Sequence, residues 1–273
     1  MRPDRVGRRE HLIKEFPEIV TGEKIAHDSV WQREIPKQME NPAPPPATHE
    51  QACVRVASRF PERWLRHYVV HKLRADPVFM AAFAWLRESR APLLDVGCGV
   101  GLLPFYLRER GLVQPVTGLD IDGPKIRRGR AVARDNYREI DLREHDVATT
   151  ELPAFRGDVV IFDILHYLPV AAQQSLLQSL AACVPPGGLL LIRDCPRDGS
   201  ARFWMTYVGE IFAQAVSWNI GGPLHFPPLA SLHAPFPENE WTRQEEPAWG
   251  HLPFNNRLLI FRRRASAAVP AAG

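Results

Sequence analysis

The spacing of apolar residues changes near residue 90 and divides the chain into two parts. Between residues 51 and 90 apolar residues recur every three or four positions, as in RWLRHYVVHKLRADPVFMAAFAWL, and this period predicts helices. Asp76 precedes Pro77 in that stretch, and a proline disfavours the helical conformation of the residue before it. We therefore expect two helices separated there, which form a helical lead-in or cap to the rest of the chain.

Beyond residue 90 short apolar runs alternate with amphipathic ones. The apolar runs predict strands at 91–97, 115–121, 138–147, 157–165 and 188–194. The amphipathic runs between them predict helices at 101–111, 123–138 and 171–184. This alternation is typical of crossover units, in which helices cover both faces of a parallel sheet.

The pattern loosens after residue 194. It predicts a helix at 203–218, a proline-rich connection at 221–241 and two final strands near 242–248 and 256–263. Together the elements predict an α/β fold, a doubly wound Rossmann-like sheet of about seven strands with the last strand antiparallel. An N-terminal helical extension precedes this sheet.

Both ends of the chain differ in composition from its middle. Residues 1–50 are polar and close with the proline cluster NPAPPPATH, which favours extended, poorly packed chain, so we expect a flexible extension. Residues 265–273 are expected to form a disordered tail. The main domain is then expected at 91–264, after the helical lead-in at 51–90.

Composition and charge narrow the classes of function. The chain has 273 residues, 45% hydrophobic and 24% charged, which is ordinary for a globular protein. The net charge of +3 comes without a long Lys/Arg run, which argues against a nucleic-acid partner. The four cysteines lack metal-ligand spacing, so no metal site is predicted. Without an apolar run of about 20 residues or a signal-peptide pattern, we expect no membrane span and a cytoplasmic protein.

The stretch LLDVGCGVGLLPFYL, residues 93–107, carries the most specific chemistry. Its glycines follow Asp95 at positions i, i+2 and i+4, whereas a dinucleotide fingerprint needs the third glycine at i+5, where Leu102 stands. No GK[ST] follows, so a mononucleotide phosphate loop is not predicted either. The glycines could serve tight packing alone. The functional alternative is a ligand that approaches the bare backbone and brings an amino group to Asp95, as S-adenosylmethionine would.

The nine residues LLDVGCGVG resemble the first motif of the class I S-adenosylmethionine-dependent methyltransferases, in which an acid precedes GxGxG. The resemblance is to the small-molecule branch of methyltransferase types 11 and 12. It implies that S-adenosyl-L-methionine is the cofactor. It also implies that the cofactor binds at Asp95, Gly97, Cys98, Gly99 and Gly101.

Two later acids fit the same resemblance. The segment VTGLDID supplies Asp120, 19 residues after Gly101, where the family holds the ribose hydroxyls with a carboxylate, a group that only accepts hydrogen bonds. Ile121 would then pack on the adenine, and Asp146 with Val147 of EHDV would meet the adenine amino group. The alternatives are an ordinary acid at a strand end for Asp120 and a helix N-cap for Asp146.

The segment DVVIFDILHYLP resembles the fourth motif of the small-molecule branch. The resemblance implies that Asp163, Ile164 and Leu165 lie along the methionyl moiety and the sulfonium. His166 would point to the methyl-transfer side and act as a general base, because histidine titrates near neutral pH. Other histidines that compete for this role are His225, His233 and His251. Each could instead be structural, and a carboxylate acceptor needs no base.

The methyl acceptor is predicted by exclusion and by aromatic content. The chain lacks the [DN]PP[YF] tetrad of nucleic-acid amino-methyltransferases, the Pro-Cys of cytosine C5 enzymes and the paired-glutamate loop of arginine methyltransferases. Residues 203–254 are rich in aromatic residues and prolines, which predicts a partial lid over a flat, apolar acceptor. Tyr68, His71 or Lys72 of the helical lead-in could meet the methionine carboxylate.

A second, less specific resemblance concerns EEPAWGHLPFNNRLLIFRR and HYVVHKLRADPVF. They are similar to methyltransferases of aryl-polyene and polyketide clusters. We therefore expect a methyltransferase of secondary metabolism that acts on an oxygen of an aromatic or polyketide-like small molecule. Two alternatives stay open: a non-catalytic subunit that binds S-adenosylmethionine, and an NAD-linked oxidoreductase, which the glycine spacing disfavours.

Overall fold

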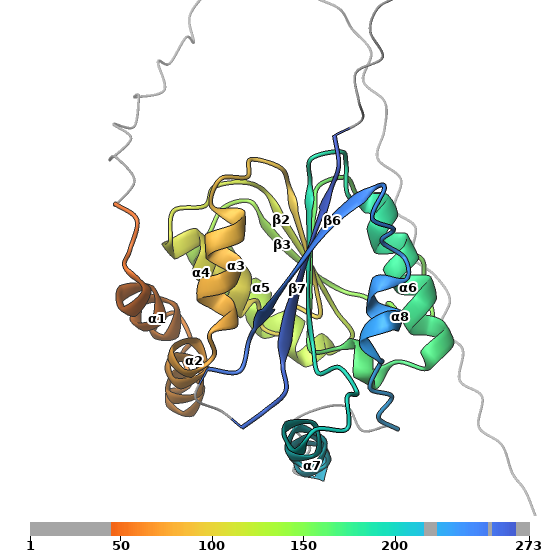
Figure 1. The fold of residues 1–273 in the computed structure, drawn as a ribbon. Helices are drawn as coiled ribbons and strands as arrows, with labels where there is room; N and C mark the ends of the chain where they lie inside the picture. Colours follow the sequence, from red (N-terminus) through yellow and green to blue (C-terminus); the bar gives the residue numbers. More distant parts are fainter. Residues whose placement is uncertain (1–44, 216–222, 251–252, 266–273) are drawn as a thin grey trace, which may run out of the picture. The chain divides into compact units, whose positions relative to one another are not determined.

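The computed structural model describes residues 45–215, 223–250 and 253–265 (Figure 1). Most of the expected N-terminal extension, the tail beyond residue 265 and the candidate histidine His251 lie outside the described residues. Within the described part, none of the helices has the length and apolar character needed to cross a membrane.

A seven-stranded sheet forms the centre of the fold, in the order β3-β2-β1-β4-β5-β7-β6. The strands are β1 Leu93–Val96, β2 Val116–Asp120, β3 Ile140–Glu144, β4 Asp158–Phe162, β5 Leu189–Asp194, β6 Trp241–Pro247 and β7 Arg257–Arg263. The first five strands pair in parallel, and β7 pairs antiparallel with both β5 and β6. The predicted α/β class and the antiparallel last strand are confirmed.

Helices cover both faces of the sheet, with α3, α4 and α5 on one side and α6 and α8 on the other (Figure 1). The helices are α1 His49–Ser58, α2 Arg63–Ala75, α3 Val78–Leu86, α4 Leu102–Glu109, α5 Gly123–Asn136, α6 Val170–Cys183, α7 Ala201–Ala215 and α8 Leu229–His233. A short 3-10 turn, η1, spans Leu165–Tyr167. The central strands are buried on both faces, which explains why their sequences are continuously apolar rather than alternating.

Each central strand divides its side chains between two hydrophobic cores. In β5, Leu189 and Leu191 join the core beneath α3 and α4, whereas Leu190 and Ile192 join the core beneath α6. Because successive side chains of a strand point to opposite faces, one apolar run supplies both layers. This arrangement fixes the carboxyl ends of β1, β2, β4 and β5 at one edge of the sheet, where the candidate residues lie.

The helical lead-in has three helices rather than two. The expected break at Asp76-Pro77 is present between α2 and α3, and an Asp76 carboxylate oxygen accepts the backbone N–H of Val78 at 3.1 Å. The additional helix α1 begins at His49, inside the stretch expected to be extended. Thr48 and Gln51 explain this early start, because their side chains and backbones form a reciprocal capping box.

Other differences concern the ends of strands and the proline-rich connection. The run 157–165 forms a strand only as far as Phe162, because Asp163 adopts a left-handed conformation with φ +58° and η1 follows. Likewise, β3 ends at Glu144 rather than at residue 147. In the connection at 221–241, residues Leu229–His233 form α8, which the sequence did not predict, and Leu232 anchors this helix in the core.

Candidate functional site

A cavity of about 710 Å³ lies at the carboxyl ends of the parallel strands, beside the point between β1 and β4 where the strand order reverses. Its walls come from α2, α3, the glycine-rich turn, the turns after β2 and β4, α7 and the residues around Trp249 and Phe254. Open α/β sheets bind ligands at such a position. The cavity is therefore the candidate functional site.

The glycine-rich turn enters the cavity from the end of β1. Gly97 has φ +82°, and a Cβ atom there would lie 2.5 Å from Cγ2 of Ile164, so a side chain is excluded both by conformation and by space. Gly99 has φ +57°, and a Cβ there would meet nothing within 4 Å. Both line the cavity, whereas Gly101 packs towards Phe105 and opens α4. The turn thus presents bare backbone to the cavity at Gly99.

Asp95 lies in β1 directly behind this turn and is 3% exposed. Burial, with a further contribution from the nearby charge of Asp120, raises the pKa of Asp95 to about 8. Its Oδ2 atom has no hydrogen-bond partner among the described residues. A buried carboxyl group of this kind favours a ligand that brings a cationic or amino group. Burial raises the pKa of the neighbouring Cys98 thiol as well, so Cys98 lines the cavity as a neutral group.

Asp120 ends β2 on the opposite side of the turn. Its Oδ2 accepts the N–H of Gly99 at 2.7 Å, and its Oδ1 accepts the N–H of Asp122 at 2.8 Å. These bonds hold the carboxylate in one orientation at the cavity wall. Each oxygen retains acceptor capacity, so the group can take further hydroxyl donors.

Several predicted contacts do not reach the described cavity lining. Asp146 uses its two carboxylate oxygens locally, accepting the N–H of Ala148 at 2.9 Å and the hydroxyl of Thr149 at 2.7 Å, as a turn-forming acid does. Val147 and Leu165 pack into the core beneath α6. Ile121 does not line the cavity either, and its side chain is 51% exposed between Asp120 and Asp122.

An ion network that the sequence analysis missed crosses the floor of the cavity. Arg193 of β5 is 3% exposed and donates to Asp163, with Nε 2.9 Å from Oδ1 and Nη2 bonded to Oδ2. Its Nη1 donates to Asp76, whose other oxygen lies 2.8 Å from Nζ of Lys72. All four residues line the cavity. The only sequence signal was the charged pair that ends the otherwise apolar run LLLIRD.

The charges of this network are strongly stabilised. Burial alone would lower the pKa of Arg193, but the carboxylates of Asp163 and Asp76 outweigh it and raise that pKa. Burial would raise the pKa of Asp76, yet Arg193 and Lys72 lower it to about 2. The network therefore stays ionised and ties α2 and α3 to the sheet. Asp163 lines the cavity as expected, with its carboxylate held by Arg193.

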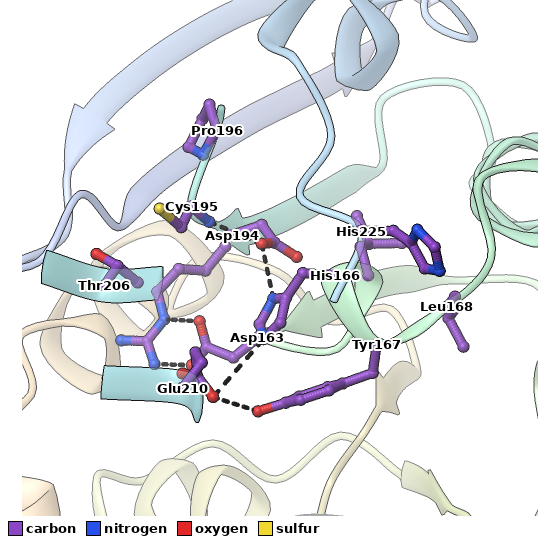
Figure 2. A network of polar contacts seen from close by, with 12 residues as sticks. Asp163, His166, Tyr167, Leu168, Asp194, Cys195, Pro196, Thr206, Glu210 and His225 are labelled. Atoms are coloured by element: carbon purple, nitrogen blue, oxygen red, sulfur yellow. Dashed lines mark hydrogen bonds and ion pairs between the residues drawn. The ribbon is translucent and has the colours of Figure 1, made fainter. Parts of the chain in front are cut away.

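His166, the predicted general base, lies behind the cavity wall rather than in it. Its ring is 3% exposed, stacks on Phe226 with centroids 4.8 Å apart, and has Nδ1 2.9 Å from Oδ1 of Asp194. His166 is the middle residue of η1 and is buried there. Glu210, which lines the cavity, lies 4.0 Å from His166 Nε2. It also accepts a hydrogen bond from the Tyr167 hydroxyl, and Figure 2 shows both contacts as dashed lines.

The other candidate histidines of the described chain do not line the cavity. The backbone N–H of His225 donates to the carbonyl oxygen of His166 at 2.7 Å. The ring of His233 packs edge-on against Phe261 on the far side of the sheet, where burial lowers its pKa. His71 is exposed, whereas Tyr68 and Lys72 of the same helix line the cavity.

Aromatic residues form another part of the cavity lining. The aromatic lining residues are Trp64, Tyr68, Phe79, Phe162, Tyr167, Trp249 and Phe254. They come from the helical lead-in, the end of β4, η1 and the loop before β7. A flat, apolar molecule suits such walls, because aromatic faces supply contact area with little conformational entropy to lose.

Comparison with known proteins reveals relatives of the central region. Residues 93–188 match a methyltransferase domain family. An uncharacterised methyltransferase of Mycobacterium tuberculosis is 33% identical over 159 residues, covering 54% of this chain and 78% of the relative. The ribosomal protein L11 methyltransferase of Burkholderia ambifaria is 32% identical over 121 residues, covering 43% of this chain and 37% of that protein.

Two further similar proteins are an O-methyltransferase and a methyltransferase of known structure. The ubiquinone biosynthesis O-methyltransferase of Coxiella burnetii is 30% identical over 118 residues, covering 43% of this chain and 48% of that protein. The structure of magnesium protoporphyrin IX methyltransferase from Synechocystis PCC 6803 with bound SAH has a TM-score of 0.52 at 17% identity. It covers 80% of this chain and 88% of the other. The two chains share one fold.

Proposed function

Since this chain belongs to the class I S-adenosylmethionine-dependent methyltransferases, we propose that it methylates an oxygen atom of a small aromatic or polyketide-like molecule. The observation that carries the proposal is one cavity with two kinds of wall. The glycine turn and its acids line the same cavity as the aromatic residues of the lead-in and of the loop before β7. A donor and a flat acceptor would thus meet in one cavity.

The first wall fits S-adenosylmethionine. We propose that the unpartnered oxygen of Asp95 meets the amino group, that the bare backbone at Gly97 and Gly99 lies against the cofactor, and that Asp120 accepts the ribose hydroxyls. Ile121, exposed beside Asp120, would cover the adenine. When bound, the cofactor supplies an electrophilic methyl carbon on a sulfonium. The protein contributes alignment and exclusion of water.

The second wall supports a small acceptor. We propose that the helical lead-in α1–α3 is a cap over the domain at 91–264, since Trp64, Tyr68 and Phe79 complete the cavity. The names of two similar proteins, a ubiquinone biosynthesis O-methyltransferase and a magnesium protoporphyrin IX methyltransferase, agree with a flat acceptor. The name of the L11 relative points to a protein acceptor, but this chain covers 37% of that protein. The walled cavity favours the small molecule.

Methyl transfer to simple aromatic compounds tests the proposal. The purified full chain is incubated with isotopically labelled S-adenosylmethionine and para-cresol, benzoic acid or aniline, and the products are identified by mass spectrometry. We expect label on the oxygen of para-cresol, with release of S-adenosylhomocysteine. Label on the aniline nitrogen would contradict oxygen as the acceptor atom. Cofactor binding without transfer to any of the three compounds would favour a non-catalytic binding subunit.

A further inference from the structure

Glu210 differs from the other carboxylates that line the cavity. The acidic lining residues are Asp76, Asp95, Asp120, Asp122, Asp163 and Glu210. Asp76 and Asp163 are ion-paired with Arg193, and Asp122 is paired with Lys125. Asp95 and Asp120 flank the glycine turn. Glu210, by contrast, forms no ion pair with lysine or arginine among the described residues, and its partners are Tyr167 and His166.

His166 and then Asp194 lie in line behind Glu210 (Figure 2). Asp194 accepts from Nδ1 of His166 at 2.9 Å, which assigns the ring proton to Nδ1 and leaves the Nε2 lone pair facing Glu210 Oε2 at 4.0 Å. Nε2 has no hydrogen bond to any other group in the described part of the chain. His166 does not line the cavity, and Glu210 is a cavity-lining carboxylate that faces its Nε2.

We propose that Glu210 is the general base of methyl transfer, and that His166 and Asp194 are positioning residues that relay the proton. This inference rests on the proposed function. The acceptor oxygen forms a bond to the methyl carbon as the methyl–sulfur bond breaks, and that electron pair moves to sulfur. The acceptor proton passes to the Glu210 carboxylate. Transfer onward to Nε2 of His166 requires the Glu210 side chain to close the 4.0 Å between Oε2 and Nε2, and it converts the ring to imidazolium beside Asp194.

The charges around His166 favour this proton-bearing state. Burial lowers the pKa of His166, but Asp194 on β5, Glu210 on α7 and Asp163 after β4 outweigh burial and raise it. Phe226 stacks on the ring and Tyr167 lies against it, so no lysine or arginine opposes the charge in the contacts that the structure describes. The ring can therefore hold the proton that Glu210 delivers until it returns to solvent.

Two phenols of different acidity test the base. The acceptor para-cresol is un-ionised near neutral pH and needs a base, whereas para-nitrophenol is largely ionised in mildly alkaline buffer and does not. We expect Glu210→Gln to slow methylation of para-cresol by about 100-fold or more, the usual scale for general-base catalysis. We expect less than about a tenfold loss with para-nitrophenol. Glu88→Gln, which changes an exposed acid, serves as the control.

The outcomes separate this inference from the proposed function. If the wild type methylates neither phenol, the proposed oxygen acceptor is wrong. If the wild type methylates both and Glu210→Gln slows both equally, Glu210 is not the base, although the function stands. His166→Asn should shift the pH profile of para-cresol methylation while leaving that of para-nitrophenol in place. An unchanged profile would overturn the positioning role.

A binding measurement tests the position of Glu210 without catalysis. Saturable binding of the phenol also shows that the variant is folded. Absorbance reports the ionisation of para-nitrophenol bound to the complex with S-adenosylhomocysteine. A Glu210 carboxylate next to the phenol oxygen disfavours phenolate, so the bound phenol should ionise at higher pH in the wild type than in Glu210→Gln. Equal titration curves in the two proteins, each showing saturable phenol binding, would contradict a carboxylate beside the acceptor oxygen.

Discussion

Asp120→Ala is expected to raise the Kd for S-adenosylmethionine by more than about 100-fold. Each hydrogen bond to a charged acceptor contributes roughly 1.5–3 kcal/mol, and Asp120 is proposed to accept two ribose hydroxyls. Losing both costs about 3 kcal/mol, and each 1.4 kcal/mol is about tenfold in Kd. The variant also removes the acceptor that holds the N–H of Gly99 at 2.7 Å, so the turn loses orientation as well. Titration calorimetry measures the affinity.

Two variants calibrate the Asp120 measurement. Asp120→Asn keeps one acceptor oxygen and should bind with intermediate affinity. Asp141→Ala removes an exposed acid from the neighbouring strand β3 and should bind as tightly as the wild type. Thermal unfolding checks that each variant is folded. Wild-type affinity in a folded Asp120→Ala protein would show that another group holds the ribose.

Arg193→Met is expected to lower the free energy of unfolding by about 3–5 kcal/mol, the scale for leaving a buried charge without its partner. The substitution leaves the Asp163 carboxylate without its ion-pair partner, and it leaves Asp76 with the Lys72 ammonium and the backbone N–H of Val78. It also removes the two side-chain hydrogen bonds to Asp163, whose backbone at φ +58° is in a conformation that is costly for a residue with a side chain. Equilibrium denaturation with urea measures the loss.

Two further variants and measurements at low pH test whether the effect of Arg193→Met on stability is electrostatic. Arg193→Met combined with Asp163→Asn should recover part of the loss, because one stranded charge is removed. Arg87→Met, at an exposed ion pair, should stay within about 0.5 kcal/mol of the wild type. The pKa of Asp76 is lowered to about 2, so its contribution to stability is full above about pH 4 and is lost as the pH falls towards 2. A change below about 1 kcal/mol for Arg193→Met would contradict a structural role for the network.

The fold could largely be predicted because its information is local. Each strand is a short apolar run between turn residues, and each covering helix has its own apolar face, so both patterns survive in a single stretch of sequence. The predictions were wrong where a local signal was overlooked or where the element was too short to give one. The capping box at Thr48 and Gln51 starts α1 within the expected extension. The five-residue helix α8 is too short for a periodic pattern.

The candidate site likewise contains residues that could be predicted from the sequence and residues that could not. The glycine turn with Asp95 and Asp120 could be predicted, because strand-end motifs specify where their residues must meet. Arg193 and Asp76 are 117 positions apart, and nothing in either segment indicates that they pair. The direction of the His166 ring depends on η1 and Phe226, a contact between distant segments. The place of Glu210 in the cavity lining was not predicted, because an acid in a helix is ordinarily solvent-exposed.

Titration calorimetry of the purified wild-type chain tests the central claim most directly, with S-adenosylmethionine, S-adenosylhomocysteine and NAD as separate titrants. The claim is that the cavity at the Gly97–Gly101 turn holds the methyl donor. It predicts saturable binding of S-adenosylmethionine and S-adenosylhomocysteine at one site per chain and no saturable heat with NAD. Saturable binding of NAD, with none for the other two, would contradict it.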